Sequence, residues 1–389
     1  MTVLRWVPVV SLLAWVWLTC CHGLFWRTDQ RLPRRRPARP APDRRWPSVA
    51  VVVPARDEAE VLPVSLPSVL AQRYPGEVRV ILVDDHSSDG TGALARGLGA
   101  AGGLPLTVTT PPPLPDGWTG KLWALRHGVR LAGPVEYLLL TDADIAHGPG
   151  SLAALVEAAE QEGLDLVSQM ARLRVATGWE RLIVPAFVYF FAQLYPFRWS
   201  NRPGSRTAAA AGGCSLVRRE ALERAGGVSA IRGAVIDDVS LARAVKRAGG
   251  RIWLGLADRV DSVRPYPRLG QLWRMVSRSA YAQLRHSPAL LLGTVLGLAL
   301  VYLVPPVATA AGLLGGRPAV AAAGAAAWAL MAGTFAPMLR YYRLPVAGAV
   351  LLPFTALLYL LMTVDSAVQH WRGRGAAWKG RTYSRPQES

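Results

Sequence analysis

Residues 48–255 alternate short apolar runs with segments that have helical spacing, and this alternation limits the fold more than any other feature. The runs SVAVVV, VRVILV, LTVT and EYLLL are typical of buried strands. Helical patterns separate them, at residues 58–72, 90–98 and 121–131. This order predicts an α/β fold with a doubly wound, mostly parallel sheet and helices on both of its faces.

Four apolar blocks outside this stretch indicate a membrane protein. Residues 6–26 carry no Asp, Glu, Lys or Arg, and about 20 such residues span a bilayer. We interpret them as an uncleaved anchor rather than a signal peptide, because the run is long and no A-x-A cleavage site follows. Three further blocks are long enough to cross a membrane: residues 289–314, 319–339 and 346–368.

The sequence therefore divides into five parts. The predicted catalytic domain, residues 48–287, follows a transmembrane anchor (1–27) and a linker rich in proline and arginine (28–47). A C-terminal transmembrane region (288–369) and a basic tail (370–389) come after it. The linker arginines predict a cytoplasmic catalytic domain. Three crossings would then put the basic tail outside, so either one block only dips into the bilayer or the tail is an exception; we favour a cytoplasmic tail.

The formal net charge of +18 is compatible with nucleic acid, a membrane surface or an anionic small molecule as a partner. The densest basic run, residues 27–45, directly follows an apolar block, where anchoring charge belongs. No stretch is typical of an RNA-binding platform, so we expect no nucleic-acid partner. Cys20, Cys21 and Cys214 show neither zinc spacing nor a disulfide framework, which favours a reducing, cytoplasmic compartment.

Ligands of doubly wound sheets bind at the carboxyl ends of the strands, so the polar residues just after each strand are candidates for the site. The first strand ends in VVVPARDEAE, where Pro54 stops the strand and Arg56, Asp57 and Glu58 follow. Capping of the next helix explains Asp57. Contact of this loop with a nucleotide is the alternative.

The second strand ends in VDDHSSDGT, with Asp84 and Asp85 at its tip. Helix capping explains Asp89 further on, but it does not explain two adjacent carboxylates. A carboxylate there can accept hydrogen bonds from a base N–H or a ribose hydroxyl. Lys121, which starts a helix behind Gly120, can offset phosphate charge.

The stretch LLLTDADI ends a predicted strand in Asp142 and Asp144, which are separated by one alanine. The two carboxylates repel each other unless a cation or a hydrogen-bond network lies between them. A divalent ion that bridges carboxylate and diphosphate oxygens would relieve this repulsion and neutralise a leaving pyrophosphate. Asp142 and Asp144 are therefore the candidate metal ligands.

Two further acids, Asp237 and Asp238, stand at the head of an amphipathic helix in AVIDDVSLARAVKRAGG. The helix dipole favours acidic residues there, which explains one of them. The second is a candidate general base that deprotonates an acceptor hydroxyl. Before this helix, Gly212 and Gly213 allow the backbone to approach a ligand closely.

Taken in this order, these motifs resemble those of the inverting family 2 glycosyltransferases of the GT-A fold, over roughly residues 48–285. The matching stretches are VVVPARDEAE, VDDHSSDGT, GKLWAL, TDADI, GGCSLVRREAL and IDDVSLARAVKRAGG. With the flanking apolar blocks and RMVSRSAYAQLRHS, the chain is most similar to the membrane-bound, hopanoid-associated glycosyltransferases of bacteria. The resemblance implies a Rossmann-like GT-A domain, a nucleotide-sugar donor, Mg²⁺ or Mn²⁺ as cofactor, and a place in the bacterial inner membrane.

The resemblance also implies roles for single residues. Asp85 would contact the nucleoside, together with the loop at Ala55 and Asp57. Asp142 would lie near the ribose and diphosphate, and Asp144 would hold the metal.

Asp238 matches the second acid of the family's acidic pair and would be the base; the family usually has Glu-Asp where this chain has Asp237-Asp238. Processive members carry Gln-x-x-Arg-Trp after the base, and residues 271–287 lack this string, which favours the transfer of a single sugar. Arg274, Arg278 and Arg285 are available to neutralise diphosphate, and we include Arg278 among the donor-binding candidates with the choice left open.

We therefore expect a membrane-anchored enzyme that moves a sugar, from a UDP-sugar, to a lipid hydroxyl in hopanoid metabolism. The apolar, aromatic residues 181–197 form either a core helix or a helix in the membrane interface that would suit a lipid acceptor. The alternatives are a processive polysaccharide synthase and a non-catalytic membrane scaffold or transporter subunit. A scaffold does not need strand-end acids, and a transporter should carry polar residues in its spans, where Asp365 is almost the only one.

Overall fold

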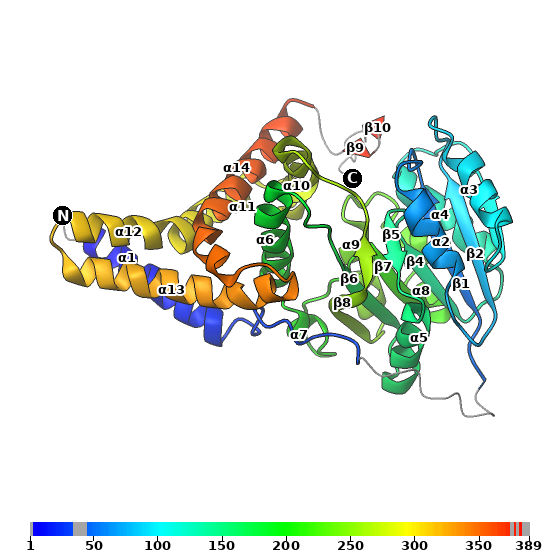
Figure 1. The fold of residues 1–389 in the computed structure, drawn as a ribbon, viewed down its shortest axis with the longest axis horizontal. Coiled ribbons are helices and arrows are strands. Elements are labelled where there is room, and N and C mark those ends of the chain that lie inside the picture. The colour runs from blue at the N-terminus through cyan, green and yellow to red at the C-terminus, as the bar shows by residue number, and fades with distance from the viewer. Residues whose placement is uncertain (1–2, 34–44, 374–376, 379–380, 383–389) are drawn as a thin grey trace. The chain divides into compact units, whose positions relative to one another are not determined.

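The computed structural model describes residues 3–33, 45–373, 377–378 and 381–382, so most of the predicted linker and most of the predicted tail lie outside it (Figure 1). The chain forms two compact units. Among the described residues, the α/β unit comprises 30–33, 45–174, 199–265, 377–378 and 381–382, and the helical unit comprises 3–29, 175–198 and 266–373. The predicted domain of residues 48–287 therefore includes segments of both units.

The described part of the α/β unit contains an eight-stranded sheet in the order β3-β2-β1-β4-β7-β6-β8-β5. Its strands are β1 (Val49–Ala55), β2 (Val78–Asp84), β3 (Leu106–Thr109), β4 (Tyr137–Thr141), β5 (Ile145–His147), β6 (Leu166–Arg172), β7 (Cys214–Arg218) and β8 (Ile252–Ser262). Pairing is parallel among β1, β2, β3 and β4 and between β6 and β8. β7 runs antiparallel between β4 and β6, and β5 pairs antiparallel with β8. The sheet is mostly parallel, as the alternation predicts.

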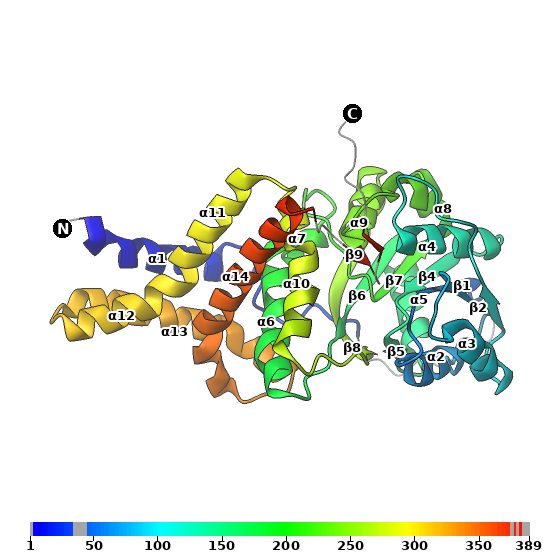
Figure 2. The ribbon, with the colours of Figure 1, turned by 90° about the horizontal axis from the view of Figure 1, so that it is seen from above.

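Helices cover both faces of this sheet because the side chains of each strand alternate between two cores. Val49, Val51 and Val53 of β1 pack with α2, α3 and α5, whereas Ala50 and Val52 pack with α4, α8 and α9. Figure 2 shows α4, α8 and α9 on one side of the strands and α2 and α3 on the other. The helices of this unit are α2 (Leu62–Leu70), α3 (Thr91–Ala100), α4 (Gly120–Leu131), α5 (Ser151–Glu162), α8 (Arg219–Arg224), the 3₁₀ turn η1 (Val228–Ile231) and α9 (Asp237–Arg247); β9 (Ala377–Trp378) and β10 (Arg381–Thr382) form a small hairpin.

The first helix starts later than its pattern predicts, at Leu62 instead of residue 58. The residues before it form a loop bound to the next strand end. Asp57 has a positive φ of 50°, and the Glu58 backbone N–H donates to Thr91 Oγ1 at 2.8 Å. These contacts hold the backbone outside the helical region and explain the difference.

The helical unit contains the long apolar helices. Its elements are α1 (Val3–Cys20), α6 (Gly178–Leu194), α7 (Phe197–Ser200, which ends in the α/β unit), α10 (Leu269–Gln283), α11 (Pro288–Leu298), the π segment η2 (Ala299–Leu303), α12 (Val304–Leu314), α13 (Pro318–Tyr341), η3 (Val346–Leu351) and α14 (Leu352–Trp371). In the described residues, Pro288–Leu314, Pro318–Tyr341 and Val346–Trp371 are long and apolar enough to cross a membrane. They coincide with the three predicted blocks. The N-terminal helix ends at Cys20, and its apolar part, Trp6–Cys20, is shorter than a typical span; the N-terminal anchor stays a prediction.

Pro305 and Pro306 of the first apolar block follow a π-helical segment. Because proline has no backbone N–H, carbonyl groups in the preceding turn lose their usual helical donors. Helix α1 supplies donors to two of them. Ser11 Oγ donates to the Leu300 carbonyl at 2.8 Å, and Trp15 Nε1 donates to the Val301 carbonyl at 2.6 Å. In hydrocarbon, freed carbonyl groups must find such partners within the protein.

Helix α6 contains most of the apolar, aromatic residues 181–197, and it lies in the core of the helical unit. Its buried side chains include Ile183, Val188 and Tyr189, and the Tyr189 hydroxyl is 2.8 Å from Thr334 Oγ1 of α13. Of the two interpretations offered by the sequence, burial favours the core helix.

Two glycines of the α/β unit allow a direct test of how tightly its layers pack. A Cβ atom on Gly128 of α4 would lie 2.5 Å from Val52 Cγ1 of β1, whereas a Cβ atom on Gly97 of α3 would meet nothing within 4 Å. We expect Gly128→Ala to lower the free energy of unfolding by about 1–3 kcal/mol through overpacking. Gly97→Ala should raise it by about 0.5–1 kcal/mol through helix propensity. Chemical unfolding in detergent, followed by circular dichroism, measures both, and equal effects of the two variants would contradict the packing described.

Candidate active site

The carboxyl ends of β1, β2 and β4 meet at one edge of the sheet because these strands are parallel and adjacent. Ala55, the last residue of β1, pairs with Asp84, the last residue of β2. Asp142 follows the last residue of β4 directly. The strand-end residues singled out in the sequence therefore come together, as the fold requires.

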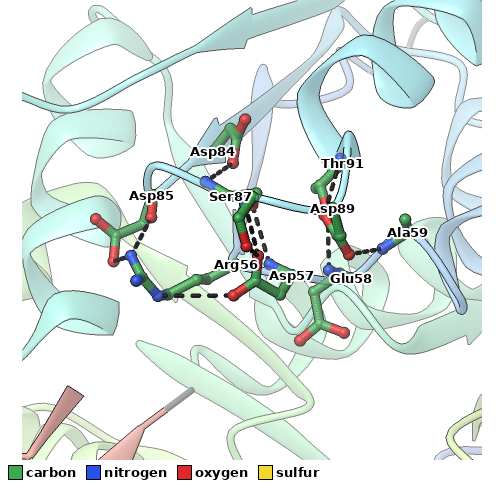
Figure 3. A network of polar contacts seen from close by, with 10 residues as sticks. Arg56, Asp57, Glu58, Ala59, Asp84, Asp85, Ser87, Asp89 and Thr91 are labelled. Atoms are coloured by element: carbon green, nitrogen blue, oxygen red, sulfur yellow. Dashed lines mark hydrogen bonds and ion pairs between the residues drawn. The ribbon is translucent and has the colours of Figure 1, made fainter. Parts of the chain in front are cut away.

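The ends of β1 and β2 form one hydrogen-bonded loop cluster (Figure 3). The Arg56 guanidinium donates to the Asp85 carbonyl at 2.6 Å and lies 3.6 Å from the Asp85 carboxylate, which is only 1% exposed. The Asp85 backbone N–H donates to the Ala55 carbonyl at 2.8 Å. Arg56, to which the sequence assigns no role, thus orients Asp85.

The remaining acids of this cluster hold its loops. Asp57 does not cap α2; its carboxylate accepts from the Ser88 backbone N–H at 2.8 Å. Asp84 accepts from the Ser87 N–H at 3.1 Å, and Asp89 accepts from the N–H groups of Thr91 and Ala59. Although its partial burial acts in the other direction, these hydrogen bonds lower the pKa of Asp89. The two adjacent strand-end acids therefore differ: Asp84 shapes the turn, and Asp85 faces Arg56.

A second cluster joins acids that lie far apart in the sequence. Lys121 Nζ, at the start of α4, is 2.7 Å from Asp142 Oδ1 and 3.0 Å from Asp237 Oδ2. Asp238 Oδ2 accepts from the Gly212 backbone N–H at 2.9 Å. The candidate metal-binding loop and the start of the helix that carries the candidate base thus meet around one ammonium group. A contact of Lys121 with phosphate stays a prediction.

Gly212 lies at the centre of this cluster. A Cβ atom there would be 3.3 Å from Lys121 Nζ, 3.5 Å from Asp238 Oδ2 and 3.7 Å from Asp142 Oδ2. The backbone at Gly212 therefore lies close to the protein's own charged side chains, and its approach to a ligand stays a prediction.

An open pocket lies at the cluster, and its empty space of about 430 Å³ includes the solvent-filled mouth. Its lining combines charged and apolar residues, and all of them belong to the α/β unit. Its lining residues are Pro54, Lys121, Leu122, Leu125, Leu140, Thr141, Asp142, Gly212, Ser215, Val228, Ile231, Asp237, Asp238 and Leu241.

Burial and neighbouring charge shift the pKa values of the cluster. Burial, followed by the negative charge of Asp237, raises the pKa of Asp238 to about 7, although Lys121 and two backbone N–H groups act in the opposite direction. Burial also raises the pKa of Asp142 to about 6, against the opposing charge of Lys121. Burial disfavours the charged form of Lys121, but Asp142 and Asp237 outweigh it and raise its pKa. A carboxylate with a pKa near 7 is suited to general-base catalysis at neutral pH.

Asp144 has basic and hydroxyl partners from the end of β8. Its Oδ2 accepts from Ser262 Oγ at 3.0 Å and from Arg264 Nε at 3.3 Å, and Arg264 also pairs with Glu58. The repulsion between Asp142 and Asp144 is therefore relieved by Lys121 and Arg264. The sequence gives no local sign of the part played by Arg264, because only the pairing of β8 with β5 brings it to Asp144.

The donor set fits a divalent metal only if a ligand completes the coordination. Among the described residues, no group of three or more His, Cys, Asp or Glu side chains could hold a metal ion. Mg²⁺ is usually bound by one or two carboxylates together with substrate phosphates and water. Asp142 and Asp144 supply two such carboxylates, so they fit a metal whose other ligands come from a diphosphate.

Arg278 lies on α10 of the helical unit, as does Arg274. The two clusters above are built from the α/β unit alone, and they contain neither residue. A contact of Arg278 with diphosphate stays a prediction.

Comparison with known proteins identifies a family and a fold for the chain. Residues 47–282 match the model of a family described as glycosyltransferase like family 2. Searched against curated proteins, the chain finds no match. Among solved structures, it is similar to the mannosyltransferase PcManGT from Pyrobaculum calidifontis in complex with GDP-Man and Mn²⁺, with a TM-score of 0.54 and 22% identity over 94% of this chain and 99% of that chain.

Two further solved structures share less of their architecture with this chain. They are TarS of S. aureus (TM-score 0.41, 15% identity, 60% of this chain and 40% of that chain) and glucosyl-3-phosphoglycerate synthase from Mycobacterium tuberculosis (TM-score 0.37, 22% identity, 61% of this chain and 80% of that chain). The fold is that of GT-A enzymes, a mixed, mostly parallel, Rossmann-like sheet, with three apolar helices toward the C-terminus. Because the family model covers more than half of its residues, the chain belongs to the family 2-like glycosyltransferases.

Proposed function

We propose that this chain is an inverting glycosyltransferase that moves one sugar from a nucleotide-sugar donor to a lipid hydroxyl. One observation carries the proposal. Asp142 of the candidate metal-binding loop and Asp238, the candidate base, line the same pocket around Lys121. An acid for the donor side and an acid for the acceptor side are the two groups that such a transfer needs.

The chain's own residues would divide the reaction between them. The N–H groups of Gly212 and Val239 each donate to one oxygen of Asp238, which orients the carboxylate. Each oxygen keeps a second lone pair that can accept the proton of an acceptor hydroxyl. The oxygen that loses this proton attacks the anomeric carbon from the face opposite the diphosphate. The bond between that carbon and the diphosphate oxygen breaks, the nucleoside diphosphate leaves with the bonding electrons, and the configuration inverts. Asp142 and Asp144 would hold the metal, which when bound neutralises charge on the diphosphate.

The donor is supported by chemistry and by one comparison. Asp85, with its carboxylate fixed by Arg56, can accept hydrogen bonds from a base or a ribose. PcManGT was solved with GDP-Man and Mn²⁺, which supports a nucleotide sugar and a divalent metal in this chain. The two donor nucleotides to compare are UDP, which the sequence predicts, and GDP.

The acceptor and location rest on the helical unit. Three helices have the length and composition of membrane spans. Their presence in the same chain as a transferase domain favours a lipid substrate. The resemblance of the sequence to hopanoid-associated enzymes supports a polycyclic lipid alcohol and the bacterial cytoplasmic membrane, with the α/β unit on the cytoplasmic side. The absence of Gln-x-x-Arg-Trp from residues 271–287 favours a single transfer.

A donor panel tests the function directly. Membranes that contain the chain should transfer label from one UDP-sugar or GDP-sugar to an extractable lipid, with a mass gain of one sugar, and removal of divalent metal with EDTA should abolish the transfer. Long sugar polymers would instead identify a polysaccharide synthase. No label transfer with any donor, from protein that is folded, would reject the proposal.

Replacement of the base should separate chemistry from folding. We expect Asp238→Asn to lower kcat by about 10²–10⁴-fold, because the acceptor hydroxyl loses its proton acceptor. Glu162→Gln removes one acidic charge at an exposed position of α5 and serves as the matched control. A folded Asp238→Asn enzyme with the activity of the control would show that Asp238 is not the base.

The charges around Asp238 predict opposite shifts of the pH profile. Because the base must be deprotonated, kcat/KM should rise with pH up to about 7 and then level off. Lys121→Met removes a charge that lowers the pKa of Asp238, so the rise should move to higher pH. Asp237→Asn removes a charge that raises this pKa, so the rise should move to lower pH. Shifts of the two variants in the same direction would contradict this assignment.

A further inference from the structure

Arg264 links two acids that come from different loops of the site. Its guanidinium pairs with Asp144 through Nε at 3.3 Å and with Glu58 through a second nitrogen. The side chains of Glu58, Asp144 and Arg264 are 8%, 16% and 23% exposed. At this burial, a charge without a partner would be costly, and the guanidinium supplies positive charge to both acids.

The backbone fixes this arrangement from the Asp144 side. The Val263 N–H donates to the Asp144 carbonyl at 2.9 Å, and Ser262 Oγ donates to Asp144 Oδ2 at 3.0 Å. Ser262 also pairs with Ile145 in the β5–β8 ladder. The end of β8 is thus fastened to the loop of the candidate metal ligands, and Arg264 follows directly after it.

One carboxylate oxygen cannot serve a guanidinium and a divalent ion at the same time without strong repulsion between the two cations. Asp144 Oδ2, which accepts from Arg264 and Ser262, is an oxygen of the candidate metal ligand. Glu58 gives Arg264 a second anchor that does not depend on Asp144.

We propose that Arg264 is a built-in counter-ion that competes with the divalent metal for Asp144 and is retained by Glu58 when the metal binds. The inference rests on the proposed function, because it takes Asp144 as a metal ligand. The free enzyme then binds the metal weakly, because Arg264 occupies Asp144. A diphosphate adds negative charge at the site and favours binding of the metal.

Titration of the full-length chain in detergent with Mn²⁺, read by electron paramagnetic resonance without nucleotide, tests the competition. We expect Arg264→Gln to bind Mn²⁺ more tightly than the parent, by roughly 5-fold or more, as for a typical coupling between sites. Arg259→Gln, which removes one positive charge from an exposed position of β8, should leave the affinity unchanged. Unchanged or weaker binding by Arg264→Gln would overturn the proposal.

Glu58 provides an effect of opposite sign. In Glu58→Gln the guanidinium loses its second anchor and should hold Asp144 more firmly, so Mn²⁺ should bind more weakly than in the parent. The double variant should bind like Arg264→Gln, because in this proposal Glu58 influences the metal site through Arg264. A double variant that binds weakly would identify Glu58 as a metal ligand and contradict the proposal.

A second titration with UDP or GDP present separates this inference from the proposed function. In one outcome, the parent chain binds Mn²⁺ with a nucleotide while the variants do not follow the expected order of affinity, which is Arg264→Gln above the parent and the parent above Glu58→Gln. That result rejects the counter-ion role of Arg264 and leaves the proposed function standing. A parent chain that binds no Mn²⁺ even with both nucleotides rejects the metal-dependent function and the counter-ion together.

Discussion

The contact of one ammonium group with two carboxylates is the interaction on which the site depends. Lys121 lies between Asp142, which follows β4, and Asp237, which starts α9. Without this charge, the acids near Gly212 would repel one another in a partly buried place, where electrostatic repulsion is stronger than in water. The contact lets the β4 loop, the Gly212 backbone and the start of α9 converge, and the pocket is the space that they enclose.

Asp142 and Asp144, which one alanine separates in the sequence, therefore have separate counter-ions in the folded chain. Asp142 pairs with Lys121 of α4, and Asp144 pairs with Arg264 beyond β8. The sequence alone suggested that a divalent ion would relieve their repulsion. The protein's own cations already offset this repulsion, so the two acids do not need a metal in order to lie close together in the folded chain. A bound metal would instead neutralise the charge of the donor.

Local patterns predicted the parts of the fold that depend on local sequence. The strands β1 to β4 and the acids at their ends follow from apolar runs and their termini, so the positions of Asp85 and Asp142 at strand ends are predictable from the sequence. The antiparallel β7 and the partner of Asp144 depend on which strands pair, and Arg264 has no neighbour in the sequence that reveals this. The late start of α2 is a similar case, because a contact from Thr91 overrides the helical pattern. The pattern of residues 175–198 likewise did not indicate that this segment packs in the helical unit.

The π segment of the helical unit has a consequence for biosynthesis. The carbonyl groups of Leu300 and Val301 find their donors in Ser11 and Trp15, close to the other end of the chain. Residue 15 leaves the ribosome long before residue 301. The N-terminal helix therefore lacks these two hydrogen bonds until the later segment has been synthesised. Packing of α1 against the π segment is therefore a late step of folding. Truncation before residue 300 would leave Ser11 and Trp15 of α1 without these hydrogen-bond acceptors.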